Sequence, residues 1–250
     1  PDGLAAVSCS ADGSARIWDL ERRETRHILN AFGATPFKVA ISPDGRTAAC
    51  AYEDYAVRLW DVATGALGAI LSGHRAEVLA VAYSSSGSRL VSASRDARVL
   101  MWEPPNEAAV STITGRLGDV LAVAMSSDGT RLLIGGETGL RLHDPIRGED
   151  IGDLPGHTAP VTGVVLTLDA STAASCSMDG TIRLWDVARR RAYQVLTGHK
   201  GPVVAVTFSM DERVVFGASH DGTVSAWSVR TGIRLGTCGT GSASSTSGAA

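Results

Sequence analysis

The chain has 250 residues, of which 44% are apolar and 20% charged, and its formal net charge is -3. Neither sign of charge dominates, so this balance gives no reason to expect binding to nucleic acid or to an anionic membrane. No apolar run approaches the ~18 residues that a transmembrane helix needs, and we expect no insertion into a membrane.

The four cysteines are sparse and lie in different parts of the chain. Their simplest interpretation is as small buried apolar side chains in a reducing compartment, not as disulfides or metal ligands. We therefore expect an intracellular protein, cytoplasmic in the first instance.

The five tryptophans recur at a period of about 42 residues, and most of them precede an aspartate. The one long gap is two periods wide, and His143 stands where the missing tryptophan is expected. A period of this length indicates one supersecondary unit that is repeated and stacked on its neighbours. The predicted units, in chain order, are 1–31, 32–73, 74–115, 116–156, 157–198 and 199–238.

The fifth unit shows the predicted strands most clearly, at 161–166, 172–177, 181–185 and 193–196. Short β-rich runs bounded by Gly, Asp and Ser indicate a four-stranded antiparallel meander. Such a sheet is twisted and has two faces to cover, and stacking several of them around an axis covers both. The sequence therefore predicts an all-β propeller of about six blades. The first unit lacks its innermost strand, and residues 239–250, which contain only Gly, Ser, Thr and Ala, are expected to be a disordered tail.

The spacing of Gly156-His157, Asp179 and Trp185-Asp186 resembles the WD40 repeat, and the likeness extends over most of the chain. The resemblance implies a propeller of seven or more blades, of which this chain supplies about six. It also implies a structural set of His, Ser or Thr, Asp and Trp within each blade. The residues that match this set are His74, Ser92, Asp96 and Trp102; His157, Ser175, Asp179 and Trp185; and His199, Asp221 and Trp227, with Gly217 in place of the hydroxyl.

The other units depart from this set. In the second unit Phe32 and Cys50 replace the histidine and the serine, whereas Asp54 and Trp60 remain; the first unit retains Ser8, Asp12 and Trp18. The fourth unit keeps none of the four and has Arg116, Ile134, Thr138 and His143 instead. Because an orphaned buried partner is costly, a unit is expected to keep the network whole or to lose most of it. In the sixth unit, water or backbone is expected to replace the hydroxyl at Gly217.

Ser175, His157 and Asp179 are the residue types of a hydrolytic triad, but the same three types recur one or more periods away at His74, Ser92 and Asp96. A repeated structural network predicts that recurrence, whereas a single active site does not. We therefore expect no catalysis. The remaining histidines have no metal-ligand spacing and no phosphate-binding loop is present, so no metal and no cofactor is expected.

The WD40 resemblance places partner binding on one face of the disc, at the loop before the first strand of each blade and at the turn before the third. The residues that match these positions are Phe37, Glu53, Glu77, Leu79, Arg95, Asp119, Leu121, Glu137, Met178, Val204 and His220. Together they suggest an apolar patch beside acidic residues, which would suit a protein or peptide with apolar anchors and basic flanks. The alternative is that some of these side chains pack into neighbouring loops. Nucleic acid is not expected, because only 5% of the residues are aromatic.

The function expected from the resemblance is a non-catalytic scaffold that assembles a multiprotein complex through this face. Two alternatives remain open. One is a regulatory or sensor propeller in a larger protein that carries a nucleotide-binding module or acts as a ubiquitin-ligase substrate receptor. The other is a structural component of a cilium, a centriole or another cytoskeletal assembly. The fold alone does not separate them, because one fold hosts many functions.

Overall fold

The computed structural model describes residues 3–30, 33–104, 106–114 and 116–239. These residues form the strands β1 to β23 and, within the described ranges, no helix. The strands make six antiparallel sheets, one of three strands and five of four, which we call blades one to six.

The strand bounds, blade by blade, are as follows. Blade one contains β1 (Ala5–Cys9), β2 (Ala15–Asp19) and β3 (Glu24–Leu29), and blade two contains β4 (Pro36–Ile41), β5 (Thr47–Tyr52), β6 (Ala56–Asp61) and β7 (Leu67–Ser72). Blade three contains β8 (Val78–Tyr83), β9 (Leu90–Ser94), β10 (Arg98–Trp102) and β11 (Ala109–Thr114), and blade four contains β12 (Val120–Met125), β13 (Leu132–Gly136), β14 (Gly139–Asp144) and β15 (Glu149–Asp153). Blade five contains β16 (Val161–Leu166), β17 (Thr172–Ser177), β18 (Ile182–Asp186) and β19 (Arg191–Leu196), and blade six contains β20 (Val203–Phe208), β21 (Val214–Ser219), β22 (Thr223–Ser228) and β23 (Arg234–Gly239).

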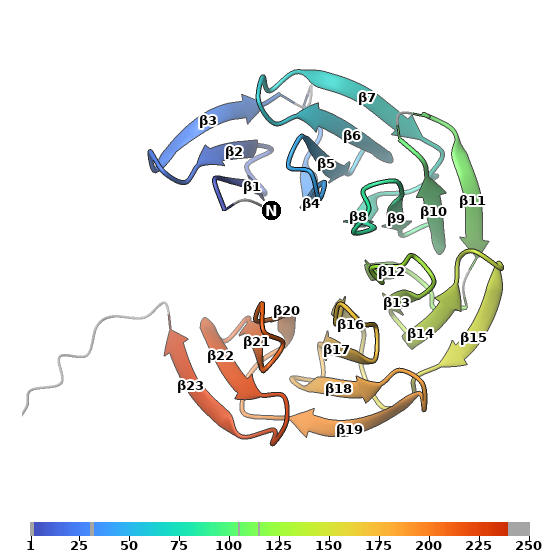
Figure 1. Ribbon diagram of the computed structural model, residues 1–250, viewed down its shortest axis with the longest axis vertical. Helices are drawn as coiled ribbons and strands as arrows, with labels where there is room; N and C mark the ends of the chain where they lie inside the picture. The colour runs from blue at the N-terminus through green and yellow to red at the C-terminus, as the bar shows by residue number, and fades with distance from the viewer. Residues whose placement is uncertain (1–2, 31–32, 105, 115, 240–250) are drawn as a thin grey trace, which may run out of the picture.

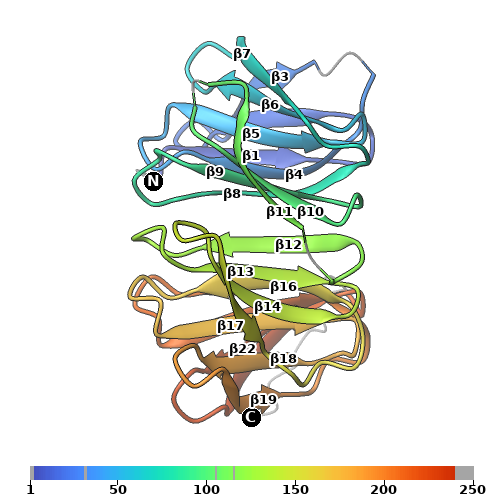
Figure 2. The same cartoon turned by 90° about the vertical axis from the view of Figure 1, so that its right-hand side faces the viewer.

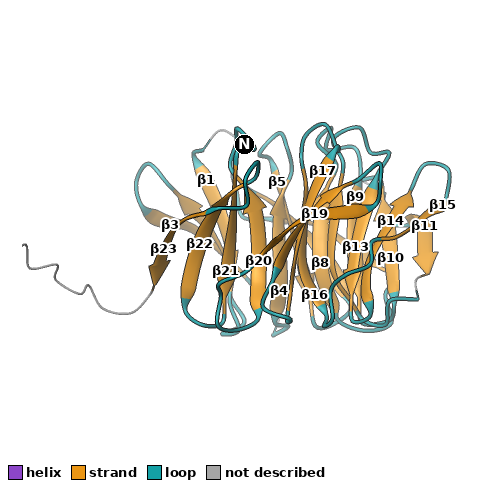
Figure 3. Ribbon diagram, turned by 90° about the horizontal axis from the view of Figure 1, so that it is seen from below, coloured by secondary structure: helices purple, strands orange, loops and turns teal. Residues whose placement is uncertain are grey.

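The blades are arranged around a common centre, as the sequence predicts (Figure 1). The first strand of blades two to six lies nearest the centre and the last strand lies at the rim (Figure 1). Neighbouring inner strands contact one another from blade to blade, and β8 lies beside β12 where blades three and four meet (Figure 2). The strands run between two ends that carry the loops (Figure 3). The ring is open between blades one and six (Figure 1).

The innermost strand is absent from blade one among the described residues, in agreement with the sequence prediction. Ala6 of β1 pairs with Trp18, just as Ala173 of β17 pairs with Trp185. Strand β1 therefore occupies the second position of a blade and pairs only with β2. The inner edge of β1 has no strand partner in the described structure.

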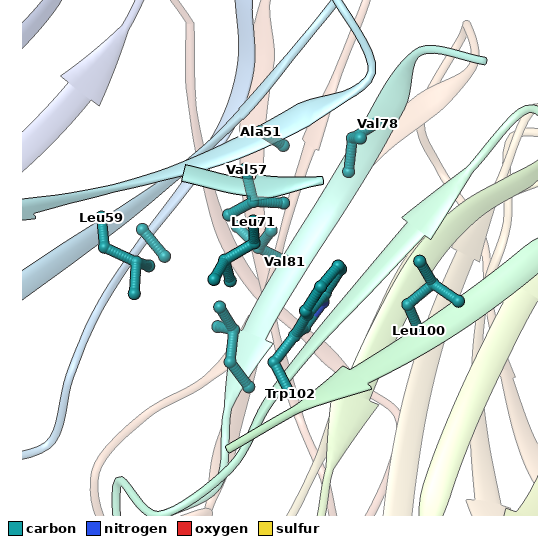
Figure 4. Packing of buried hydrophobic residues seen from close by; sticks show 10 residues of the cluster. Ala51, Val57, Leu59, Leu71, Val78, Val81, Leu100 and Trp102 are labelled. Atoms are coloured by element: carbon teal, nitrogen blue, oxygen red, sulfur yellow. The ribbon is translucent and has the colours of Figure 1, made fainter. Parts of the chain in front are cut away.

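The core consists of the faces where one blade packs on the next. The indole of Trp102 in blade three is fully buried and belongs to one hydrophobic cluster with Ala49, Val57 and Leu59 of blade two. Figure 4 shows this ring among side chains of the two blades. Trp185 lies in a buried cluster with residues of blade four in the same way, and Trp60 and Trp227 likewise cluster with residues of the preceding blade.

The strands of blade five follow the predicted ranges closely, and the small shifts have a local cause. The predicted strands 161–166 and 172–177 coincide with β16 and β17, whereas β18 begins at Ile182, one residue later than predicted. Thr181 instead belongs to the turn, because its backbone N–H and its hydroxyl both donate to Asp179, at 2.9 and 2.6 Å. At the end of the chain, β23 includes Gly239, and the remainder of the expected tail lies outside the described residues. Within those residues, no helix is long and apolar enough to cross a membrane.

Candidate functional site

Blades three and five each hold a complete polar quartet, by which we mean the His, Ser, Asp and Trp side chains of one blade. In blade five, His157 Nδ1 lies 2.8 Å from Asp179 Oδ2, and His157 Nε2 lies 2.8 Å from Ser175 Oγ. The indole Nε1–H of Trp185 donates to the same Ser175 oxygen, also at 2.8 Å. The quartet connects the loop before β16 to β17, the following turn and β18.

Blade three repeats this geometry nearly atom for atom. His74 Nδ1 lies 3.0 Å from Asp96 Oδ2 and His74 Nε2 lies 2.8 Å from Ser92 Oγ, while Trp102 Nε1–H donates to Ser92 at 2.9 Å. The two serines are wholly buried. The sequence reasoning thus grouped residues that are in direct contact.

The direction of each hydrogen bond follows from the donors that are present. A carboxylate only accepts, so His157 Nδ1 carries the proton that is donated to Asp179. Nε2 of the neutral ring is then an acceptor, and the Ser175 hydroxyl donates to it while accepting from Trp185. Burial lowers the pKa of His157 and His74 despite the adjacent aspartates, so both rings are neutral at physiological pH. Burial acts to raise the pKa of Asp179, but the hydrogen bonds from Thr181 and His157 outweigh it and set that pKa at about 2.

In these quartets the aspartate, histidine and serine are hydrogen-bonded in the same sequence as in a hydrolytic triad. The serine, however, lacks the accessibility that catalysis needs. A nucleophilic serine must be exposed beside a space for the scissile bond and oxyanion donors. Ser175 is wholly buried and its oxygen already accepts the indole N–H. The arrangement is therefore suited to joining strands, and the same set in blade three serves the same purpose.

Blade six replaces the missing hydroxyl with a main-chain atom, as expected. His199 Nε2 lies 3.2 Å from the carbonyl oxygen of Gly217, to which it donates. The volume that a side chain would need at Gly217 is already filled, because an added Cβ would lie 2.2 Å from Ile182 Cδ1 of blade five. Glycine at this position therefore accompanies a larger side chain on the neighbouring blade.

Blade two has a different solution, which the sequence reasoning missed. Arg58 is buried and both of its terminal nitrogens donate to Asp54, one of them at 2.9 Å. The guanidinium carbon lies 4.6 Å from the centre of the Tyr52 ring. An arginine–aspartate pair thus replaces the histidine–aspartate pair, and Phe32, which stands in the histidine position, lies outside the described residues. The only signal in the sequence was an arginine four residues after the turn aspartate.

The cysteines are unpaired. Cys50 and Cys176 are wholly buried, and burial raises the pKa of their thiols to about 12 and about 11 respectively. Cys9 is half-buried and Cys238 is exposed on β23, so the prediction of a buried apolar side chain is wrong for Cys238. The reason is that β23 lies at the rim of the last blade. Among the described residues, no group of three or more His, Cys, Asp and Glu could hold a metal ion.

The candidate interaction face is built from a backbone irregularity that occurs in every four-stranded blade. The pairing register shifts by one residue near the start of each inner strand, which leaves one bulged residue per blade. The bulged residues are Phe37, Leu79, Leu121, Thr162 and Val204. A β-bulge redirects a side chain relative to the regular ladder, so these residues are set apart from the blade core. Phe37 is 41% exposed, whereas Leu79, Leu121 and Val204 are half-buried.

A second repeated feature ties the turn before the third strand to the loop before the first. In each of these five blades, one residue of the turn before the third strand donates its backbone N–H to a carbonyl in the loop before the first strand. The accepting residue stands two positions before the bulged residue in the sequence. The donors are Glu53, Arg95, Glu137, Met178 and His220, and the acceptors are Thr35, Glu77, Asp119, Pro160 and Pro202. The structure thus brings these positions together in pairs, blade by blade. Met178 is 50% exposed and His220 is exposed.

The charged residues of this face are partly paired with each other. Arg95 Nη1 lies 3.5 Å from Glu77 Oε1, and Arg95 Nε lies 3.7 Å from Asp119 Oδ2 of the next blade. Glu53 accepts the backbone N–H of Thr35 at 3.0 Å, and Glu137 accepts that of Asp119 at 3.4 Å. The acidic set is therefore held in place by local bonds, and Arg95 offsets two of its four charges.

The sequence reasoning also missed Lys38, which follows the bulge of blade two and is exposed. It lines a small pocket near the centre of the ring together with Leu121, Thr162 and Val204. No sequence signal identifies it, because its position beside a bulge follows from the register of strand pairing.

The comparison with family models decides the identity of the fold. The WD40 family, described as WD domain, G-beta repeat, matches residues 1–19, 27–61, 65–103, 148–186 and 190–228. The chain belongs to the WD40 family. The longest unmatched stretch, 104–147, covers most of blade four, whose quartet is absent. A search of curated proteins found no match to the chain.

Proposed function

We propose that this WD40 propeller is a non-catalytic scaffold that assembles a protein complex through the bulge face, the surface formed by the bulged residues and the paired turn residues described above. WD40 propellers in general bind other proteins or peptides. The observation that carries the proposal is the exposure of Phe37 at a bulge, because a large apolar side chain beside charged residues is typical of an interaction surface.

The partner best suited to this face is a protein segment with an apolar anchor for Phe37 and basic residues for the carboxylates of Glu77 and Asp119. Both carboxylates lie on neighbouring blades and share Arg95. Exposed ion pairs of this length contribute little to stability, so a basic partner could displace Arg95 at small cost.

The first test uses two apolar residues of blade two with nearly equal exposure. Phe37 is 41% exposed on the bulge face, and Ile70 is 39% exposed on the outer strand β7. Affinity purification with mass spectrometry should recover the same proteins with the wild type and with Ile70→Asp. Phe37→Asp should lose them at an unchanged melting temperature, and a purified partner should bind it at least about tenfold more weakly. Equal capture by both variants would refute the proposal.

The second test concerns the basic flanks. Arg95→Ala frees two carboxylates and should strengthen partner binding, whereas the double change Glu77→Arg with Asp119→Arg should weaken it. Both effects should shrink as salt concentration rises, because exposed charges are screened. Unchanged affinity in both variants at low salt would exclude a partner with basic flanks.

A further inference from the structure

A pocket lies between blades three and four, where blade four lacks its tryptophan. Its volume is about 280 Å³. Val99 of β10, Val120 of β12 and Ile134 of β13 form an apolar wall, and all three are buried. His143 of β14 and Thr112 of β11 contribute polar groups. In Figure 1, β11 lies at the rim of blade three, and β14 lies inside the rim strand β15 of the adjacent blade four.

The pocket exists because a smaller ring stands in the tryptophan position. His143 pairs with Leu132, and a register shift falls just before His143. Trp185 has the same pairing with Ala173 and the same preceding shift. In blade five the indole at this position is wholly buried against the preceding blade. An imidazole cannot fill the volume of an indole, so unfilled volume remains beside blade three.

One lining residue, His143, also carries an unsatisfied polar atom. His143 is 7% exposed, and its Nε2 is buried without a hydrogen-bond partner among the described residues. Buried polar atoms are nearly always paired, so an unpaired one on a residue that lines a pocket indicates a missing partner. At the rim, Arg141 is held by Asp150 at 2.9 Å and by Asp153 at 3.0 Å. Because the guanidinium of Arg141 is already paired with these two carboxylates, the rim of the pocket favours a neutral ligand over an anionic one.

We propose that this pocket binds an indole ring, which fills the volume left by the absent tryptophan and, when the His143 ring turns so that Nε2 faces the pocket, donates its N–H to that atom. The fold itself places an indole at the equivalent position of the other blades. The size is adequate, because an engineered apolar cavity of about 150 Å³ holds benzene and indole is larger by one fused ring. This site is separate from the bulge face and does not depend on the proposed scaffold function.

The first experiment titrates the purified propeller with indole, N-methylindole and N-acetyl-L-tryptophanamide, followed by calorimetry and backbone amide chemical shifts. Indole should bind with a dissociation constant on the order of 1 mM or below and should shift amides of β11 and β14. N-methylindole lacks the N–H and should bind about tenfold more weakly. Binding of the tryptophanamide as well would assign the site to a partner's side chain, whereas binding of indole alone would assign it to a small molecule; both results support the proposal.

The second experiment fills the pocket from within. His143→Trp should abolish indole binding and raise the melting temperature, because the protein then supplies its own ring. Ile146→Trp adds a tryptophan to the same blade at an exposed position outside the pocket and should keep the wild-type affinity for indole. The proposal is overturned by the absence of saturable indole binding, by equal affinity for N-methylindole, or by unchanged binding to a folded His143→Trp protein. If that variant does not fold, the N-methylindole comparison on the wild type decides the question.

Discussion

The hydroxyl of Ser175 joins two other members of its quartet by hydrogen bonds. Its oxygen accepts from Trp185 and its proton goes to His157, which in turn donates to Asp179. Every member has a partner, and none is accessible to a substrate. The energetic role of the hydroxyl lies mainly in what its removal would leave unpaired.

The variant Ser175→Ala should therefore be strongly destabilising. It leaves Trp185 Nε1 and His157 Nε2 buried without a partner, which should cost about 2–4 kcal/mol of unfolding free energy. Ser72→Ala, at an exposed position at the end of β7, should change the unfolding free energy by less than about 0.5 kcal/mol. Chemical denaturation measures both. A near-neutral Ser175→Ala would mean that the quartet does not stabilise blade five.

The effect of a substitution at Gly217 on stability depends on Ile182 of the neighbouring blade. Gly217→Ser alone should destabilise blade six, because the new Cβ would overlap Ile182 Cδ1. Ile182→Val removes that atom, and the serine could then bond His199 as Ser175 bonds His157. The double variant should be more stable than the sum of the single changes predicts, by about 1 kcal/mol or more. Additive effects in a denaturation cycle would contradict this account.

The histidines of the complete quartets should make stability depend on pH. Burial lowers the pKa of His74 and His157 in the folded state, so the unfolded chain takes up protons first as the pH falls. The unfolding free energy should be highest above the ordinary histidine pKa of about 6.5 and should decrease as the pH falls below it towards the folded-state pKa. Denaturation at several pH values with an NMR titration of the two rings tests this. Rings that protonate at or above the ordinary pKa would show the opposite sign.

At the scale of the strands, the bulges do more than shape the interaction face. The hydroxyl of Thr162, at the bulge of β16, donates to the carbonyl of Val203 on β20 at 2.5 Å. This bond joins blade five to blade six next to the centre of the ring. A residue at the same bulge position can thus serve as an exposed apolar group in blade two and as a link between blades in blade five.

Thr162→Val keeps the shape of the side chain and removes the hydroxyl. It should lower the unfolding free energy by about 1 kcal/mol, whereas Thr197→Val, at an exposed position after β19, should have little effect. Hydrogen exchange should show the loss of protection in β20 first. If β20 is unaffected, the bond does not couple the two blades.

The strands themselves were predictable because turn residues and β-rich runs alternate at a fixed period. The predicted strands at 161–166 and 172–177 coincide with β16 and β17. The bulges were not predictable, because they arise from the hydrogen-bond register and have no common residue type: Phe37, Leu79 and Thr162 share one position. The Arg58–Asp54 pair was missed for a related reason, since an arginine in this part of the third strand also occurs in other blades without replacing the histidine.

At the scale of the molecule, the open ring leaves one tryptophan uncovered. Trp60, Trp102, Trp185 and Trp227 are buried against a preceding blade, whereas no described blade precedes Trp18, which is only half-buried. Its indole N–H still donates to Ser8 at 2.8 Å. The bond within the blade is thus formed even where the packing between blades is absent.

Acrylamide should therefore quench the fluorescence of Trp18 more strongly than that of the other four tryptophans. The quenched component should disappear in Trp18→Phe and persist in Trp227→Phe. Protection of Trp18 in the purified chain would mean that another copy of the chain covers this face, and sedimentation would then show an oligomer.

The central claim is that the buried quartets stabilise the fold whereas the exposed bulge face binds partners. The most direct test measures the melting temperature and the capture of partners together for Ser175→Ala and Phe37→Asp. We predict that Ser175→Ala melts about 5 °C or more below the wild type and, when folded, retains its partners. We predict that Phe37→Asp melts like the wild type and loses them. Loss of partners by a folded Ser175→Ala at an unchanged melting temperature, with full capture by Phe37→Asp, would contradict the account.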